Sequence, residues 1–264
     1  MDKRYVLLTA MMAVVLAAYV AYGLSYIHVV SRPAVVVKHI KGAAYSLNWA
    51  GYVVSGQAGA VTSVAGSFVV PSLTCTKQTT YVALWAGLDG YNDNTVEQAG
   101  ILGECSGGKP IYEAWYEFYP SPSVPISGLT VQPGDRVYVN VTYLGNGQFA
   151  ITMVIYETNG KVESYSVTGT EPSAQLSSAE CILERPTVNG QLTALANFGT
   201  AYFGQDYTSI GGTCYARVNG VVAPFGSLSA IQLVMVSSSG KILAQPSSLT
   251  GDGSSFTVTF VNSR

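Results

Sequence analysis

Two glutamates flank a tryptophan in the segment Tyr112–Tyr119, which reads YEAWYEFY. In a β-strand, alternation would place Glu113, Trp115 and Glu117 on one face of the sheet. A sugar ring could stack on the indole while the two carboxylates act as acid and base, so a carbohydrate-binding or glycan-cleaving site is one interpretation. An outer sheet face with two solvated glutamates and no chemistry fits the same pattern.

A second pair of carboxylates lies in the segment Ser178–Glu184, which reads SAECILE. Alternation places Glu180, Ile182 and Glu184 on one face and Cys181 on the other. A carboxylate inside an apolar strand is costly unless it is partnered or faces a cleft, so this face is a candidate site. The period-two pattern does not choose between Glu180 and Glu184.

The histidine count excludes the commonest hydrolytic sites. The chain has two histidines, His28 and His39, and both precede most of the sequence. Ser–His–Asp and Cys–His sites need an imidazole to accept the proton of the nucleophile, and none lies after residue 39. The four scattered cysteines do not predict a zinc site, so we expect no metal and no cofactor. Hydrolytic chemistry would have to use carboxylates, amides or hydroxyls.

The composition is that of a globular chain without a nucleic-acid partner. Of the 264 residues, 48% are hydrophobic and 11% are charged, which is too apolar for a disordered chain. The net charge is −2 and the isoelectric point is about 5.7. A nucleic-acid binder usually has a basic surplus, and this chain has none.

The elements that must position the candidate residues are short strands. β-branched and aromatic residues are abundant, turn signals such as Asn159-Gly160 separate them, and no long helical period follows residue 30. We predict strands over 46–55, 61–70, 80–88, 111–119, 136–144, 148–157, 162–168, 178–184, 194–203, 214–218, 230–236 and 255–262. So many strands without helices predict an all-β antiparallel sandwich in one domain.

The N-terminal segment predicts export. Charged residues at positions 2–4 precede a mostly apolar run over residues 5–24, which is typical of a signal peptide and is also long enough to span a bilayer. We predict an N-terminal apolar helix within residues 1–30, either cleaved or kept as a membrane tether, a linker over 31–44 and one domain over 45–264. Four cysteines without a CxxC motif and a sequon at Asn140 favour an extracellular protein, secreted or anchored to the outer face of the membrane.

Short motifs in a fixed order carry a resemblance to a known family. They are NWAGY (48–52), VAGSFVVP (64–71), WAGLDG (85–90), EQAG (97–100), YEAWYEFYP (112–120), SAE (178–180), ILERP (182–186) and LANFG (195–199). Over roughly residues 46–262 the chain resembles the glutamic peptidases, or eqolisins (peptidase family G1), typified by acid endopeptidases of filamentous fungi. The resemblance implies a sandwich of two long bent antiparallel sheets, concanavalin A-like or jelly-roll-like. It also implies hydrolysis of polypeptide substrates at acid pH.

The resemblance assigns the catalytic pair to Gln98, in EQAG, and Glu180, in SAE. It implies that the two side chains face one shared cleft, close enough to hold a single water. A glutamate carboxylate can take a proton from an attacking water, and a glutamine amide can donate to an oxyanion without titrating itself. Neither role needs a histidine.

Five further residues match the family's cleft, and the resemblance implies that they contact substrate or support the catalytic pair. They are Trp85, Asp89, Glu113, Trp115 and Glu117.

Two features depart from the family pattern. The family often has a tryptophan after the catalytic glutamate, whereas this chain has Cys181, which alternation turns away from the Glu180 face. Cys181 could pair with Cys214, and Cys75 with Cys105, but four cysteines allow three pairings. The residues between the apolar run and NWAGY leave no room for the long propeptide of the fungal enzymes, so activation would differ or be absent.

Overall fold

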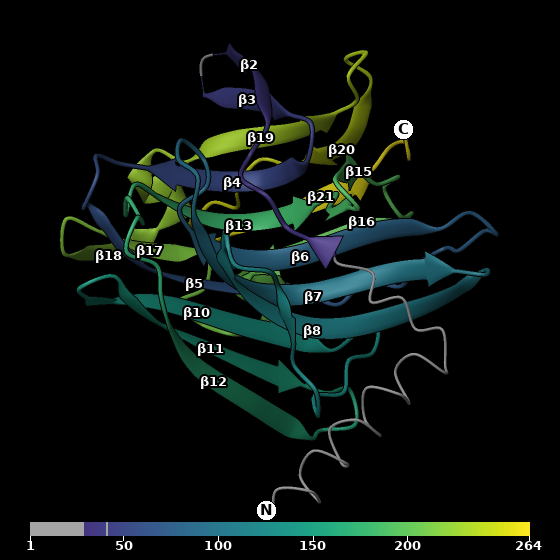
Figure 1. Cartoon of the computed structure of the whole chain (residues 1–264), viewed down its shortest axis with the longest axis horizontal. Helices are drawn as coiled ribbons and strands as arrows, with labels where there is room; N and C mark the ends of the chain where they lie inside the picture. Colours follow the sequence, from purple (N-terminus) through teal and green to yellow (C-terminus); the bar gives the residue numbers. More distant parts are fainter. Residues whose placement is uncertain (1–28, 41) are drawn as a thin grey trace, which may run out of the picture.

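The computed structural model describes residues 29–40 and 42–264 and shows an all-β protein (Figure 1). The predicted N-terminal apolar helix falls in residues 1–28 and so lies outside the described residues. The described part has two short helices, α2 (Gln205–Thr208) and the 3-10 helix η1 (Phe225–Leu228). Neither has the length or the hydropathy needed to span a bilayer.

The first layer of the fold is a continuous series of strands. In spatial order it contains β2 (Val36–Ile40), β3 (Ala43–Ser46), β19 (Ile231–Val236), β4 (Trp49–Ser55), β13 (Ser178–Glu184), β6 (Thr80–Leu88), β7 (Val96–Ser106), β8 (Lys109–Tyr119) and β9 (Val124–Pro125). Each neighbouring pair is antiparallel except β3 and β19, which run parallel. The candidate motifs therefore fall on adjacent strands, β13, β6, β7 and β8.

A second layer packs against the first. It contains β12 (Val162–Thr170), β11 (Gln148–Tyr156), β10 (Arg136–Gly145), β5 (Val61–Val69), β16 (Thr200–Gly204) and β21 (Ser255–Phe260), with β17 (Tyr215–Val218) and β18 (Val221–Pro224) beside the other half of β5. The strand β20 (Ile242–Pro246) pairs with both β19 and β21 and so connects the layers. A separate small sheet joins β1 (Val29–Val30), β14 (Thr187–Val188) and β15 (Gln191–Leu192).

The main core lies between the two layers. On β6, Leu84, Ala86 and Leu88 share one face and pack in a buried cluster with Phe68 and Ile151 of the second layer. All nine residues of β6 are buried, so its opposite, outer face is covered as well. The sequence of a strand that is buried on both faces is usually a continuous apolar run, and the sequence of β6 is of this kind.

The first described residues of the chain cover part of that outer face. In Figure 1 the purple segment leaves β1 near β6 and crosses in front of β13 and β4 on its way to β2. Ala34 and Val36 pack against an outer cluster that includes Trp49, Trp85 and Trp115. The stretch 31–44, predicted as a linker, contains this crossing segment, β2 and the first residues of β3.

Several strand predictions agree with the structure and others do not. The ranges 80–88 and 178–184 coincide with β6 and β13, and the Asn159-Gly160 turn joins β11 to β12. The predicted strand 194–203 is wrong over most of its length, since only 200–204 pair as β16. No prediction covers β7, because Gly100 and Gly103 weaken its strand pattern.

Candidate active site

Four strands of the first layer bring the predicted catalytic residues into one row. Glu180 of β13 pairs in register with Gly87 of β6, Gly87 with Gln98 of β7, and Gln98 with Glu117 of β8. Residues paired in register point to the same face, so the three polar side chains share the outer face. Two inter-strand spacings, about 10 Å in total, separate the Cα atoms of Glu180 and Gln98.

The residue between Glu180 and Gln98 in the row is a glycine, and neighbouring atoms approach it closely. A Cβ atom at Gly87 would lie 2.8 Å from the Gln98 Cβ and 3.3 Å from Cζ3 of Trp85. Contacts this short force a neighbouring group to shift. Position 87 therefore requires glycine, because the Gln98 side chain and the Trp85 ring already lie against it.

Glu117 fixes the orientation of the Gln98 amide. Nε2 of Gln98 donates to Oε2 of Glu117 at 2.7 Å, and both side chains are fully buried. Burial raises the pKa of Glu117 well above its ordinary value, the Glu184 carboxylate raises it further, and the bond from Gln98 offsets part of the effect. An amide NH₂ has two hydrogens, so one N–H of Gln98 remains for another acceptor.

Glu180 carries the unpartnered carboxylate of the row. Its side chain is fully buried, and no described residue donates a hydrogen bond of good geometry to either oxygen. Burial is the main cause that raises the pKa of Glu180 well above its ordinary value, although the nearby Ser178 hydroxyl lowers it. The Asp89 and Asp93 carboxylates add to the rise. Such a group exchanges a proton readily once water reaches it.

Glu184 lies on the same face, four residues further along β13, and is fully partnered. Its Oε2 accepts from Nε1 of Trp85 at 2.8 Å and from the Ser31 hydroxyl. Its Oε1 accepts from the backbone N–H of Arg32 at 3.1 Å. Burial raises the pKa of Glu184 to about 7, against the lowering effect of these donors. Since three donors hold Glu184, Glu180 is the carboxylate with free oxygens.

The tryptophans form an apolar floor rather than an exposed platform. The rings of Trp49 and Trp85 meet edge to face, with centroids 4.8 Å apart, and Trp115 is only 5% exposed. Glu113 is exposed on the same face as Glu117, and in the described part no hydrogen bond joins it to the row. The carbohydrate interpretation is not favoured, because Trp115 and Glu117 offer a sugar almost no exposed surface.

Asp89 holds the start of β13. It has a left-handed backbone, with φ of 66°, and its carboxylate accepts the N–H groups of Leu176 at 2.8 Å and Ser177 at 2.6 Å. Burial raises the pKa of Asp89 to about 6, those backbone donors lower it, and the Asp93 carboxylate raises it. These bonds support a positioning role for Asp89, through the segment that leads into Glu180.

The open cleft that the resemblance implies is not seen, because the chain covers the row. Gln98 and Glu180 have no exposed surface. Ser31, itself 3% exposed, places its hydroxyl 3.4 Å from Oε1 of Gln98 and donates to Glu184. Ser31 was not among the predicted site residues, and neither was Asn48, which binds the same segment. Asn48 belongs to the NWAGY motif, but a motif does not show which segment its side chain contacts.

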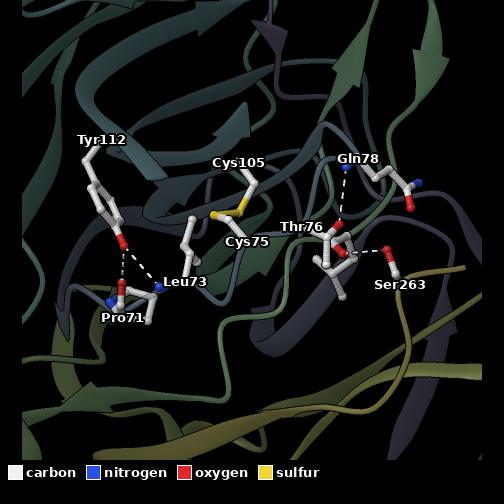
Figure 2. Close-up of a disulfide and its surroundings, with 9 residues drawn as sticks. Pro71, Leu73, Cys75, Thr76, Gln78, Cys105, Tyr112 and Ser263 are labelled. Carbon is white, nitrogen blue, oxygen red and sulfur yellow. Dashed lines mark hydrogen bonds between the residues drawn. A yellow bond between two sulfur atoms is a disulfide. The ribbon is translucent and has the colours of Figure 1, made fainter. Parts of the chain in front are cut away.

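The four cysteines form one disulfide and one buried pair of free thiols. Cys75 and Cys105 form a disulfide that joins the connection before β6 to the end of β7, and Figure 2 shows it with its surroundings. Cys181 lies on the core face of β13, as alternation predicts, and its sulfur is 2.6 Å from that of Cys214. Of the two disulfides considered from the sequence, the structure contains Cys75–Cys105, whereas Cys181 and Cys214 lie side by side as free thiols.

This face offers a carboxylate and an amide on the two strands that flank Gly87. The described residues contain no cluster of three or more His, Cys, Asp and Glu side chains that could hold a metal ion. The carboxylates divide into two electrostatic groups, Glu180 with Asp89 and Glu97, and Glu184 with Glu117. A proton acceptor and a hydrogen-bond donor on either side of one residue suit the attack of a water on a carbonyl.

Comparison with known proteins points to one family. The model of the Peptidase A4 family matches residues 47–258. Aspergillopepsin-2 from Aspergillus niger is 28% identical over 237 residues, which cover 82% of this chain and 78% of that protein. The crystal structure of scytalido-glutamic peptidase with a transition state analog inhibitor has a TM-score of 0.66 at 23% identity and covers 81% of this chain and 98% of that one. An eqolisin-family peptidase in complex with the tripeptide Ala-Ile-His has a TM-score of 0.59 at 22% identity, with the same coverage.

Proposed function

Because this chain belongs to the Peptidase A4 family, it is a peptidase, and we propose that Glu180 and Gln98 are the pair with which it cleaves peptide bonds at acid pH. The observation that carries the proposal is the row on the outer face of the first layer. Gly87 separates the two residues there and adds no side chain between them. The full partnering of Glu184 supports Glu180 as the reactive carboxylate.

Glu180 acts as general base and then as general acid. A water over Gly87 loses a proton to a Glu180 oxygen while the water oxygen attacks the carbonyl carbon of the scissile peptide bond. The resulting tetrahedral intermediate collapses when Glu180 returns the proton to the leaving nitrogen and the C–N bond breaks. The carboxylate is then regenerated. Both oxygens are free for these transfers, since no described residue donates to them with good geometry.

Gln98 stabilises the negative charge on the carbonyl oxygen during this attack. One N–H of its amide is held by Glu117, and the other is directed at the oxyanion. Loss of one such donor typically raises the barrier by about 3–4 kcal/mol. An amide does not titrate, so this donor works throughout the acid range.

Acid operation fits a base that is a carboxylate. Such a group is partly ionised near pH 4, where a histidine base would be fully protonated. In the covered state burial raises the pKa of Glu180, and entry of water and substrate lowers that desolvation cost.

Polypeptides are the substrate class that the relatives support, since one was solved with a tripeptide. We propose that Trp85 and Trp115 form the floor on which substrate side chains lie once the row is uncovered. Glu113, exposed beside them, contacts the substrate at the rim. Asp89 positions β13 and Glu117 positions Gln98.

We also propose that the enzyme acts outside the cytoplasm, either secreted or tethered through residues 5–24. The Cys75–Cys105 disulfide supports this location, because disulfides persist in oxidising compartments. Fractionation of the source cells tests it. Activity confined to the cytosolic fraction would contradict the proposal.

Casein digestion at acid pH tests the catalytic pair. Glu180→Gln should lower kcat at least 1,000-fold and Gln98→Ala at least about 100-fold, because they remove the base and the oxyanion donor. Asp206→Asn, at an exposed carboxylate, is the matched control and should behave as wild type. Circular dichroism and thermal unfolding establish that the variants are folded. Full activity in either folded variant would remove the assignment.

A further inference from the structure

We propose that residues 31–36, here called the cover segment, occupy the substrate cleft of the full-length protein as a built-in inhibitor that must be displaced or cut before peptides bind. The inference rests on the proposed function, because it concerns the row that contains Gln98 and Glu180. The family match begins at residue 47, so the cover segment lies outside the residues that this chain shares with the family model.

The cover segment touches the proposed catalytic machinery directly. The hydroxyl of Ser31 lies 3.4 Å from Oε1 of Gln98 and donates to Glu184, and the Arg32 N–H donates to Glu184 at 3.1 Å. With the segment in place, neither Gln98 nor Glu180 has any surface that a solvent molecule can reach. A peptide therefore cannot enter while these contacts persist.

Asn48 anchors the backbone of the cover segment. Its Nδ2 donates to the carbonyl oxygens of Arg32 at 3.2 Å and Pro33 at 3.1 Å, and its Oδ1 accepts the N–H of Val35 at 2.8 Å. The donor and acceptor atoms of one side chain thus bond the backbone of three residues in an extended segment. Hydrogen bonds to the main chain are also how a protein binds an extended peptide ligand. These bonds make the segment a bound ligand rather than a loose connection.

Further anchors lie at both ends of the cover segment. The N–H of Ala34 donates to the carbonyl of Gly90 at 2.9 Å, and Ala34 also packs with Val36 on the tryptophan floor. Before the segment, β1 pairs with β14, which follows β13 closely in the chain. After it, the carbonyl of Val35 accepts the N–H of Leu47 at 2.9 Å. The segment is held along its whole length across the site.

The cover segment is seated as an inhibitor and not as a substrate. The group that it presents to Gln98 is a hydroxyl, whereas the reaction needs a peptide carbonyl there. Nε2 of Gln98 bonds to Glu117, and within the described residues no carbonyl of the segment accepts from it. The segment can therefore remain in the cleft without being cut.

An accessible stretch follows the cover segment. Val37 is 54% exposed and Ile40 is 47% exposed on β2, at the rim of the molecule. A cut there turns the segment from a tethered ligand into a separate peptide. Tethering keeps its effective concentration high, so release follows from the cut.

Thiol labelling tests whether the segment is seated, independently of activity. Ser31→Cys and Val37→Cys are each made in full-length Glu180→Gln protein, which keeps the segment uncut by the enzyme itself. We expect a maleimide to label Cys at position 31 at least 100-fold more slowly than Cys at position 37, since Ser31 is 3% exposed and Val37 is 54% exposed. Labelling rates within about threefold of each other would overturn the proposal.

Progress curves of casein digestion test whether the segment inhibits. Ser31→Ala/Ala34→Pro removes the hydroxyl contacts and the bond to Gly90, and Ser164→Ala, at an exposed serine, is the matched control. We expect an initial rate at least tenfold above wild type for the double variant. Wild type and Ser164→Ala should show a lag that ends when the N-terminus is shortened. Equal initial rates without a lag overturn the inhibitor and leave the proposed function intact.

The two experiments separate the inference from the function on which it rests. If Cys at position 31 is protected but no variant ever digests casein, even after the N-terminus is shortened, the proposed function fails while the seating of the segment is supported. If casein is digested but Cys at position 31 reacts freely, the peptidase stands and the cover segment is overturned.

Discussion

Gln98 serves the proposed reaction only if an N–H of its amide, and not its carbonyl oxygen, is presented to the substrate. Glu117 holds one N–H of Nε2 at 2.7 Å and so restricts the rotation of the amide, which leaves the second N–H of the same nitrogen for the substrate. The pKa of Glu117 is raised well above its ordinary value, so at acid pH the group is protonated and its carbonyl oxygen still accepts. Glu117 is therefore a positioning residue for Gln98.

Replacing Glu117 tests this role. Glu117→Ala should lower kcat about 10- to 100-fold, equivalent to about 1.4–2.7 kcal/mol in the barrier, because the amide loses its fixed orientation. KM should change little. Glu117→Gln keeps an acceptor oxygen and should recover most of the activity. A Glu117→Gln variant as impaired as Glu117→Ala would show that the residue acts in another way.

At the residue scale, strand alternation predicted which side chains of a strand share a face but not which partners each side chain has. Alternation put Glu180 and Glu184 on one face and could not rank them, because their difference lies in the partners that Ser31 and Trp85 supply. Those partners come from distant parts of the chain. Ser31 could not be predicted as a site residue, since the sequence around a serine in a proline-containing stretch does not show which distant residues it contacts.

Among the elements, β7 shows most clearly what a sequence pattern misses. It carries Gln98, yet Gly100 and Gly103 interrupt its strand pattern, and the family motif alone located the glutamine. The glycines have a structural reason. A Cβ at Gly100 would lie 2.1 Å from the carbonyl oxygen of Leu84, so close packing against β6 requires glycine there. The need for glycine arises between strands and cannot be derived from one strand.

The glycine at position 87 gives a prediction about β6. Gly87→Ala should lower kcat/KM about 100-fold, because the new Cβ would lie 2.8 Å from the Cβ of Gln98 and must displace it. Gly211→Ala is the matched control, since a Cβ there meets nothing within 4 Å. Kinetics and thermal unfolding are measured together. If Gly87→Ala loses no activity, the space over Gly87 is not where the water lies.

The disulfide gives a second prediction about elements. Cys75–Cys105 closes a loop with a sequence separation of 30, which in the chain-entropy model stabilises the fold by about 3–4 kcal/mol. Figure 2 places it in the connection that Tyr112 also holds, by donating to the carbonyl of Pro71 and accepting the N–H of Leu73. Cys75→Ala/Cys105→Ala should lower Tm by about 10 °C. An unchanged Tm would show that the Tyr112 bonds suffice.

For the whole molecule, buried carboxyl groups make stability depend on pH. Burial, with nearby carboxylates, raises the pKa of Glu97 to about 10, and burial raises that of Glu184 to about 7 and that of Asp89 to about 6. These values lie above the roughly 4–4.5 of an unfolded chain, so the folded protein keeps protons that the unfolded chain releases. The free energy of unfolding is therefore largest in acid and falls as pH rises above about 4.5.

Thermal unfolding across pH checks this dependence. In Glu180→Gln, which does not digest itself, Tm should fall by more than 10 °C between pH 4 and pH 7, since each group removes up to about 1.4 kcal/mol per pH unit until its folded pKa is reached. The decline ends near pH 6 for Asp89 and pH 7 for Glu184, and continues for Glu97. Adding Glu97→Gln should make the curve shallower, whereas adding Ser164→Ala, at an exposed serine, should not. A Tm that rises toward pH 7 would contradict the prediction.

The parallel pairing of β3 with β19 limits where a cut can release the cover segment without harm. Backbone groups of residues 232–235 on β19 are bonded to residues 43–46. Severing the chain before Ala43 lets β3 stay in place. Severing it after Ser46 allows β3 to dissociate. The unpaired N–H and C=O groups of β19 could then pair with a strand of another molecule and promote aggregation. The mature enzyme should therefore begin between residues 37 and 43, so that maturation leaves β19 paired with β3 and exposes no new edge strand.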